Sequence, residues 1–455
     1  MCVIVLFSSL HTLFACVDLS LQVKAMSFYR GKTILAPMVR VGNVGFRVFC
    51  AAQGADVVFT EEVVAAKLAR CHREVRVYND AAGPMIEFVA YELFKNQYKR
   101  SVVFTTPIRD VANQSGEGAP VVLQLGVSDE AVGVAAALLC CEDVDGIDVN
   151  MGCPKKFSVD NGMGAALMRE TSKAASILFA LDDALNAPDK LAARGRRVPL
   201  SFKIRLLETA EATAEMLISI MEKVGAHRVH AITLHARTVN QAAEDSPHYD
   251  RAAEAVRRLR SHPLFKEMCF VLNGSVRSRE DGAVKMTQFG FDAVMIARHA
   301  MWDMSVFSRH VPSARGRSSL SSEDAEAPLA STSWMDLYRA LLRTHAKYRT
   351  PFTYVKYHLT RSIPCIPAMK HLMTAVQQEA TCYEDLAKIF ALPLEEQESM
   401  RGVAAVEMVA CVPNREVTLG VVSSTATNHN DAARSGRVPN EECAATPIAK
   451  KPRGE

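Results

Sequence analysis

Short, continuous runs of apolar residues recur along the first two thirds of the chain, and each is followed by a stretch with helical spacing. Runs without polar alternation are typical of strands that are buried on both faces of a parallel sheet. A repeat of eight strands, each followed by a helix, predicts the α/β fold class of a (β/α)8 TIM barrel. A doubly wound sheet is less favoured, because no Gly-x-Gly-x-x-Gly pattern follows the first run. The predicted strands lie at residues 34–38, 55–60, 121–126, 146–150, 200–205, 231–236, 270–274 and 293–298.

The same pattern divides the chain into domains. Between the second and third strands, residues 71–119 are predicted to form a lid or a hairpin excursion from the barrel. The barrel is followed by a segment without periodicity and then by amphipathic helices, which predict a small all-helical domain. The expected segments are an N-terminal extension outside the fold (1–29), the barrel (30–311), a linker (312–332), the helical domain (333–395) and a polar, disordered tail (396–455).

Composition and charge describe an ordinary soluble globular protein. The 455 residues are 49% hydrophobic and 23% charged, with a net charge of +3. The 12 cysteines show neither repeated Cys-x-x-Cys nor Cys/His ligand spacing, which argues against a metal site and a disulfide framework. We expect a monomer without membrane attachment. A cytoplasmic location is favoured, with a mitochondrial or nuclear one as the alternative, because the apolar N-terminus lacks the basic residues of a secretory or transit signal.

One thiol lies where a barrel places its chemistry. Cys153 belongs to the motif Asn-Met-Gly-Cys-Pro-Lys at residues 150–155, directly after the apolar run 146–149. Gly152 permits an unusual backbone angle, and Pro154 prevents an immediate helix. The motif therefore predicts a thiol at the carboxyl end of a strand, where catalytic side chains collect in barrels. A buried structural cysteine is the alternative.

Polar residues at other strand ends predict a site for one flat, phosphate-bearing ligand. Glycine and arginine after the last two strands suit a phosphate, and a lysine can stabilise a ring that becomes anionic on reduction. These demands are met by FMN. The candidate residues are Pro37, Met38 and Val39 as a wall for the ring, Gln124, Lys203 and His235 in the barrel mouth, and Asn273, Gly274, Ser275, Ala297 and Arg298 at the phosphate.

These motifs together resemble the tRNA-dihydrouridine synthase family over about residues 30–390. The resemblance rests on residues 34–42, 124–126, 146–155, 202–205, 234–237, 273–274 and 297–298. The motifs at residues 38–42 and 150–155 are most similar to those of the eukaryotic subgroup that modifies position 20 of the D-loop. It implies a flavin-dependent reduction of uridine to 5,6-dihydrouridine in tRNA, with FMN on the residues named above and NADPH as the reductant. It also implies that Cys153 is the general acid that protonates carbon 5 after hydride reaches carbon 6, a role that suits a thiol, since it carries its proton near neutral pH.

A tRNA partner requires a basic surface, and the helical segment offers one. Residues 331–375 contain seven Lys or Arg against a single acid, with tyrosines 338, 348, 354 and 357 between them. Such a pattern is typical of RNA binding, although a solvated helix face is the alternative. The candidate RNA contacts are Arg339, Arg343 and Lys347 on one helix, and Arg40, Lys155, Lys156 and Arg237 around the mouth.

Two departures from the family and two rival functions stay open. Residues 158–164 include Asp160 and Asn161 at positions where the family leads us to expect basic residues or glycines. In addition, the sequence after the helical domain shows no double-stranded-RNA-binding module. The first rival is an FMN barrel reductase that acts on a free small molecule. The second is a non-catalytic tRNA-binding protein whose barrel has lost its chemistry.

Overall fold

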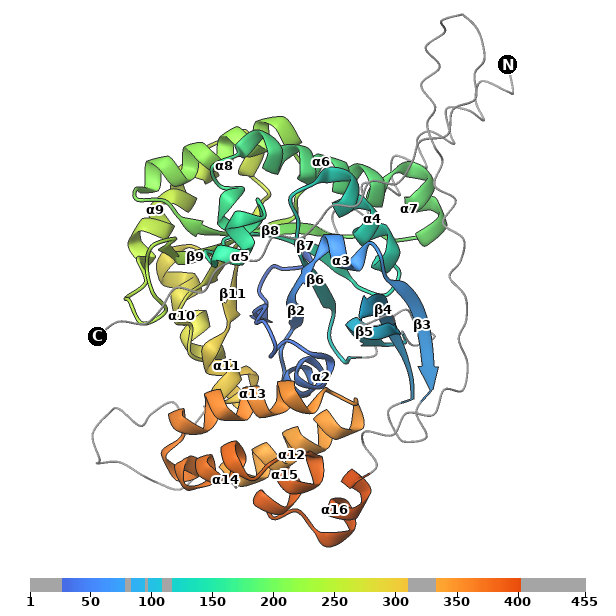
Figure 1. Cartoon of the computed structure of the whole chain (residues 1–455). Helices are drawn as coiled ribbons and strands as arrows, with labels where there is room; N and C mark the ends of the chain where they lie inside the picture. Colours follow the sequence, from blue (N-terminus) through green and yellow to red (C-terminus); the bar gives the residue numbers. More distant parts are fainter. Residues whose placement is uncertain (1–26, 78–82, 95–96, 109–116, 310–332, 402–455) are drawn as a thin grey trace, which may run out of the picture. The chain divides into compact units, whose positions relative to one another are not determined.

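Eight strands rich in Val, Ile and Leu form a closed parallel barrel in the computed structural model of the protein (Figure 1). The structure describes residues 27–77, 83–94, 97–108, 117–309 and 333–401. Most strand residues are buried, because helices cover the outside of the barrel and side chains fill its inside. The order β1-β11-β10-β9-β8-β7-β6-β2 confirms the predicted TIM barrel. The strands are β1 (Thr33–Leu35), β2 (Val57–Val64), β6 (Val121–Gly126), β7 (Gly146–Met151), β8 (Leu200–Leu206), β9 (Ala231–Thr238), β10 (Cys269–Asn273) and β11 (Ala293–Ile296).

Three of the helices that follow barrel strands, α4, α8 and α10, begin at polar capping residues. Asp129, Thr209 and Ser278 each accept a hydrogen bond from a backbone N–H of the first turn, which satisfies a donor that the helix leaves free. The helices of this part are α2 (Val44–Ala52), α3 (Ala65–Leu68), α4 (Glu130–Cys140), α5 (Lys156–Asp160), η1 (Gly164–Ala166), α6 (Thr171–Asn186), α7 (Pro188–Arg194), α8 (Ala210–Val224), α9 (Tyr249–Arg260), η2 (Pro263–Phe265), α10 (Arg279–Phe289), α11 (Arg298–Trp302) and η3 (Met304–Phe307).

The insertion after β2 is a small antiparallel sheet. Its strands β3 (His72–Val77), β4 (Pro84–Phe94) and β5 (Gln97–Pro107) pair in the order β3-β4-β5. The β4–β5 pair is the predicted hairpin, and β3 adds a third strand to it. The aromatic rings of Phe88 and Phe104 stack across β4 and β5, with centroids 5.5 Å apart, so the sheet has an apolar face of its own.

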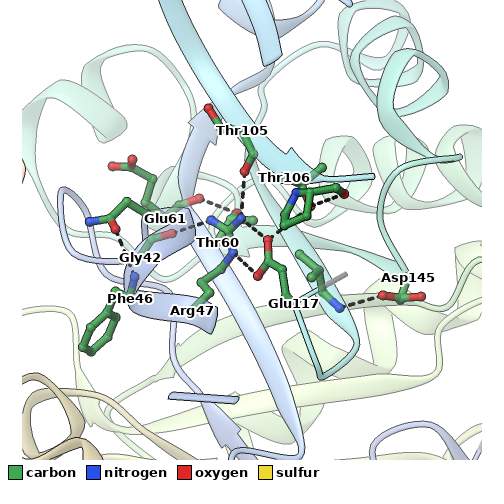
Figure 2. A network of polar contacts seen from close by, with 12 residues as sticks. Gly42, Phe46, Arg47, Thr60, Glu61, Thr105, Thr106, Glu117 and Asp145 are labelled. Atoms are coloured by element: carbon green, nitrogen blue, oxygen red, sulfur yellow. Dashed lines mark hydrogen bonds and ion pairs between the residues drawn. The ribbon is translucent and has the colours of Figure 1, made fainter. Parts of the chain in front are cut away.

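A buried ion pair ties this insertion to the barrel, as Figure 2 shows. The Arg47 guanidinium, on α2, donates to both carboxylate oxygens of Glu117, at 2.8 and 2.5 Å. It also donates to the carbonyl oxygens of Gly42 and Thr105, both at 2.8 Å. Thr106 donates to the same carboxylate at 3.1 Å. Because Arg47 joins α2, β5 and the chain before β6, it fixes where the chain returns from the insertion to the barrel.

The chain after the barrel forms a helical region that packs against α2 and α11. The hydroxyl of Tyr338 donates to the carbonyl of Trp302 at 2.9 Å, and Nε2 of His358 lies 2.7 Å from the carbonyl oxygen of Met301. The helices, orange and red in Figure 1, are α12 (Trp334–Lys347), α13 (Phe352–Ser362), η5 (Ile363–Cys365), η6 (Pro367–Leu372), α14 (Met373–Gln378), α15 (Tyr383–Ile389) and α16 (Leu394–Arg401).

Two predicted boundaries need correction. Tyr29, expected outside the fold, is buried under the barrel, and its hydroxyl lies 3.2 Å from Oγ of Ser201. Helix α16 continues to Arg401, so the tail predicted from residue 396 starts too early. The predicted linker at 312–332, most of the N-terminal extension and the rest of the tail lie outside the described residues.

Candidate active site

Polar side chains of the neighbouring strands β6, β7 and β8 form a hydrogen-bonded chain inside the barrel. Nε2 of Gln124 donates to Oδ2 of Asp148 at 2.8 Å, and Oγ of Ser201 donates to Oδ1 of Asp148 at 2.7 Å. Nδ2 of Asn150 donates to Oε1 of Gln124 at 3.4 Å. Burial raises the pKa of Asp148 to about 6, although these hydrogen bonds favour the carboxylate. The chain fixes the orientation of Gln124, a predicted cofactor residue, and of Asn150.

The loop that carries Cys153 is held from two sides. Oδ1 of Asn150 accepts hydrogen bonds from the backbone N–H groups of Gly152 and Cys153, both at 3.0 Å. The carbonyl oxygen of Cys153 accepts from the N–H of Ala165 at 3.0 Å. Gly164 has a φ of +59°, and a Cβ there would lie only 3.0 Å from Cβ of Cys153. The half-buried thiol is therefore placed by the backbone around it rather than by its own packing.

Cys153 lines a cavity of about 440 Å³, a size that suits a small-molecule or nucleobase ligand. The cavity gathers predicted residues from the ends of β1, β6, β7 and β11, and Tyr357 and Arg361 reach it from α13. Its lining is Pro37, Met38, Val39, Val41, Glu62, Gln124, Asn150, Cys153, Lys155, Arg298, Met301, Tyr357 and Arg361.

Lys203 lies in the barrel beside the network. Its backbone pairs with Asn150 in the register of β7 and β8. Desolvation, together with the charge of Arg205, lowers the pKa of Lys203 to about 8, against the opposing effects of Asp148 and Cys153. The ammonium group is therefore close enough to Cys153 and Asp148 to interact with them, and it loses its charge just above neutral pH.

The turn after β10 has a backbone suited to an anion. Gly274 has a φ of +120° and Ser275 a φ of +51°. Backbone N–H groups in a turn can face a bound anion. A Cβ on residue 274 would lie 3.2 Å from Cδ2 of His235, so only glycine fits beside that ring. Asn273 precedes the turn, pairs with His235 in register, and donates from Nδ2 to the carbonyl of Met295 at 2.9 Å.

Cations gather around this turn. The Arg237 guanidinium donates to Oγ of Ser275 at 2.8 Å and lies 3.2 Å from Nε2 of His235. Arg298 follows Ala297 at the start of α11, where it donates to the carbonyl of Ala243 and lies 3.6 Å from Glu244. Desolvation first, and then the charges of Lys203, Arg205, Arg237 and Arg298, hold the pKa of His235 well below its usual range. A neutral ring in a cationic setting fits a site for a phosphate.

Comparison with known proteins identifies the family of the chain. Residues 34–406 match the family described as dihydrouridine synthase. The chain belongs to the dihydrouridine synthase family. It is 30% identical over 371 residues to the tRNA-dihydrouridine(20) synthase of Schizosaccharomyces pombe, covering 82% of this chain and 67% of that protein. It is 29% identical over 345 residues to that of Saccharomyces cerevisiae, covering 74% and 79%. Identity to a human tRNA-dihydrouridine(20a/20b) synthase-like protein is 25% over 283 residues, covering 62% of this chain and 73% of that protein.

The predicted RNA contacts of this dihydrouridine synthase lie in different surroundings. Arg40, Lys155 and Lys156 are exposed. Arg40 adopts a φ of +65° and its N–H donates to Oε2 of Glu61 at 2.8 Å, so its unusual backbone is held in place. Arg237 is only 2% exposed and its guanidinium is bonded at the predicted phosphate turn. The prediction of an RNA contact for Arg237 is therefore not supported by its position.

On α12, two of the three predicted basic contacts have partners within the helical region. Arg339 donates to the carbonyl of Phe390 at 2.8 Å, and Arg343 donates to the Glu396 carboxylate at 2.6 and 3.0 Å. The exposed Lys347 lies over the ring of Tyr348, 5.4 Å from its centroid. Tyr338, expected to stack on RNA, is fully buried, so that expectation is wrong.

Sequence reasoning left several cavity residues out of the candidate list. Asn150 belongs to the cysteine motif. Its position three residues before Cys153 is the signal for its role as the acceptor for the backbone N–H groups of the loop. Tyr357 and Arg361 are four residues apart, so they lie on one face of a helix. The sequence pattern assigns them to the basic RNA surface of residues 331–375 and does not single them out as cavity residues. Glu62 lies beyond the apolar run of β2, and its position in the cavity follows only from the length of that strand.

In the described part of the chain, no cluster of three or more His, Cys, Asp or Glu side chains is arranged to hold a metal ion. Within the same residues, no helix has the length and hydropathy needed to cross a bilayer.

Proposed function

We propose that this chain reduces a uridine in the D-loop of tRNA, at position 20, to 5,6-dihydrouridine. The observation that carries the proposal is the position of Cys153, which shares one cavity with the residues predicted to wall a flat ring. Membership of the dihydrouridine synthase family supports the reaction. The similar yeast proteins, whose names give dihydrouridine(20) in tRNA and NAD(P)+, support the target and the nicotinamide cosubstrate.

The residues present fit FMN. The turn at Gly274 and Ser275 offers backbone N–H groups and two neighbouring guanidinium groups to a phosphate, and Pro37–Val39 offer an apolar wall to a ring. FMN, when bound and reduced by NADPH, supplies the hydride for carbon 6 of the uracil. Lys203 would hold positive charge beside the ring.

Cys153 would complete the reaction by giving its proton to carbon 5 of the uracil. The two N–H bonds to Asn150 fix the loop, so the thiol can meet the base without first reorganising. The hydrogen-bonded chain of Asn150, Gln124 and Asp148 in turn fixes Asn150. The reaction requires two things of the protein, a cofactor site and a correctly placed general acid.

A uracil in a folded tRNA must leave its stack to reach this cavity. Arg40, Lys155 and Lys156 are exposed beside cavity-lining residues and would hold the phosphates around the extruded nucleotide. Arg339, Arg343 and Lys347 are proposed as a secondary part of the RNA surface, since Arg339 and Arg343 would have to exchange the partners that they already have.

Nucleoside mass spectrometry of tRNA from cells that lack this protein tests the proposal. Loss of dihydrouridine at position 20 alone, restored by the wild-type gene but not by a Cys153→Ala gene, is the expected result. Unchanged dihydrouridine at every position would contradict it. Turnover of free uridine or orotate by the purified protein, without turnover of tRNA, would favour the rival small-molecule reductase.

A further inference from the structure

The cavity beside Cys153 is rich in hydrogen-bond donors and poor in free acceptors. Lys155, Arg298 and Arg361 carry donors only. Oδ1 of Asn150 already accepts two backbone N–H groups, and Oε1 of Gln124 already accepts from Asn150. The acceptors that the lining side chains have left are the second lone pair of Gln124 Oε1, the hydroxyl of Tyr357 and the carboxylate of Glu62, which is the strongest of them.

Glu62 is the acceptor that lies next to the thiol. It sits in β2 and pairs in register with Gln124. Desolvation raises its pKa, while hydrogen bonds with the side chains of Asn150, Ser158 and Cys153 and the charge of Lys155 oppose that rise, so its carboxyl group adjoins the loop that carries Cys153. Among the described residues, none donates a hydrogen bond to the buried Oε1 of Glu62. A buried carboxylate oxygen without a donor is costly, so Oε1 has an open position for one more donor, which a ligand can supply.

The missing donor matches one atom of the proposed substrate. The Watson–Crick edge of uracil presents acceptor, donor and acceptor in the order O2, N3–H and O4. We propose that Glu62 accepts the N3–H of the target uracil and so determines specificity for this base, an inference that rests on the proposed function. The neighbouring cations supply donors for the two carbonyl oxygens. Cytosine presents a lone pair at N3, which a carboxylate repels.

The adjacent carboxylate provides a matched control. Successive residues of a strand point to opposite sides, and Glu61 accepts the N–H of Arg40 at 2.8 Å instead of lining the cavity with Cys153. Figure 2 shows Glu61 close to Arg47 and Gly42, and with them it lines a separate cavity of about 110 Å³. A change at Glu61 therefore alters charge at the same strand without touching the proposed base contact.

The test compares two tRNA transcripts, with uridine or 3-methyluridine at the target position, under single-turnover conditions. The wild-type enzyme should prefer uridine by at least about 100-fold, because the methyl group replaces the N3–H. Glu62→Ala should reduce this preference to about threefold or less and raise the enzyme concentration that gives half of the maximal single-turnover rate with the uridine transcript. Glu62→Gln keeps an acceptor oxygen and should retain part of the preference. Glu61→Gln should keep all of it, whatever its effect on rate.

The ratio between the two transcripts separates the explanations. If Glu62→Ala and Glu62→Gln both slow the two transcripts equally, Glu62 only supports the Cys153 loop and the proposal is wrong. Flavin absorbance of each purified variant shows whether the barrel is folded, and Glu62→Gln, which conserves shape, gives the answer if Glu62→Ala does not fold. A wild-type enzyme that reduces neither transcript would overturn the proposed function itself rather than the role of Glu62.

Discussion

At Cys153, position matters more than local packing. One side chain, Asn150, accepts hydrogen bonds from two N–H groups of the loop that carries Cys153, and Gly164 allows the following segment to pass within contact distance of the cysteine. The thiol is thus held at the rim of a cavity while its own side chain remains half exposed. This arrangement suits a general acid that must protonate a nucleobase entering the cavity from solution.

Replacing Cys153 by Ala should lower the rate of dihydrouridine formation by about 10²- to 10⁴-fold, the usual contribution of a general acid. Flavin content and tRNA affinity should stay unchanged, because the loop is held by backbone contacts. Single-turnover assays with reduced enzyme measure the rate. Cys365→Ala, at an exposed cysteine of η5, is the control and should behave as the wild type. Equal rates for Cys153→Ala and the wild type would remove the thiol from the mechanism.

Lys203 predicts a specific pH dependence. Its pKa of about 8 means that the side chain is cationic below that pH and neutral above it. If the charge stabilises an anionic ring, flavin reduction should slow as pH rises through about 8. Lys203→Met should remove this step and slow the reaction by about 10²-fold at neutral pH. Lys203→Arg, which stays charged, should remove the step but keep more of the rate. A pH profile that Lys203→Met leaves unaltered would contradict the role.

Residues at strand ends were the part of the site that the sequence predicted best. A buried strand followed by a helix dictates which end of the barrel its last residue reaches, and Pro37–Val39, Gln124, Cys153 and Arg298 line one cavity. The other predicted cofactor residues do not line this cavity, and their role stays a prediction; they are Lys203, His235, Asn273, Gly274, Ser275 and Ala297. Pairing between side chains is not encoded by such a pattern. The partner of Arg343 lies 53 residues later in the chain, and for that reason a helix face that looked solvated and basic is partly neutralised.

At the scale of elements, the buried Arg47 guanidinium is one anchor of the insertion between β2 and β6, and a second ion pair joins Arg73 of β3 to Asp143. The side chains of Arg47 and Glu117 are 2% and 0% exposed, and the four hydrogen bonds of Arg47 reach three separate segments. The apolar pattern predicted that a hairpin would leave the barrel here. It could not predict the anchor, because Glu117 lies 70 residues from Arg47 in sequence.

Removing Arg47 should therefore lower the stability of the protein. Arg47→Met leaves the Glu117 carboxylate buried without its partner, and we expect a loss of about 3–5 kcal/mol in the free energy of unfolding, measured by urea denaturation. The double variant Arg47→Met/Glu117→Leu should recover a large part of this loss, since no uncompensated charge remains. If the double variant is as unstable as the sum of both single variants, the two residues are not energetically coupled.

For the whole molecule, the barrel and the helical region together line one cavity. Tyr357 and Arg361 of α13 line the same cavity as Cys153, and the Arg40 guanidinium lies 5.5 Å from the centroid of the Tyr357 ring. The helices that follow the barrel are thus part of the site, beyond any general role in holding RNA. The sequence predicted two domains, but the point where they meet depends on packing between distant segments.

Exposed cations at the mouth should dominate RNA binding. The double variant Lys155→Ala/Lys156→Ala should weaken tRNA binding and reduce the slope of log affinity against log salt by about 1.5, since each phosphate contact contributes about 0.7–0.9. Lys190→Ala, at an exposed lysine of α7, is the matched control and should leave the slope unchanged. Fluorescence anisotropy across a salt series measures both. An unchanged slope in the double variant would exclude these lysines from the RNA surface.

The most direct test incubates the purified protein with NADPH and an unmodified tRNA transcript, and then maps the nucleosides by mass spectrometry. We predict that the uridine at position 20 gains two hydrogens, that the yellow flavin absorbance of the protein bleaches on reduction, and that Cys153→Ala bleaches without modifying the transcript. A protein that is colourless, or one that oxidises NADPH while every uridine of the transcript stays intact, would contradict the account.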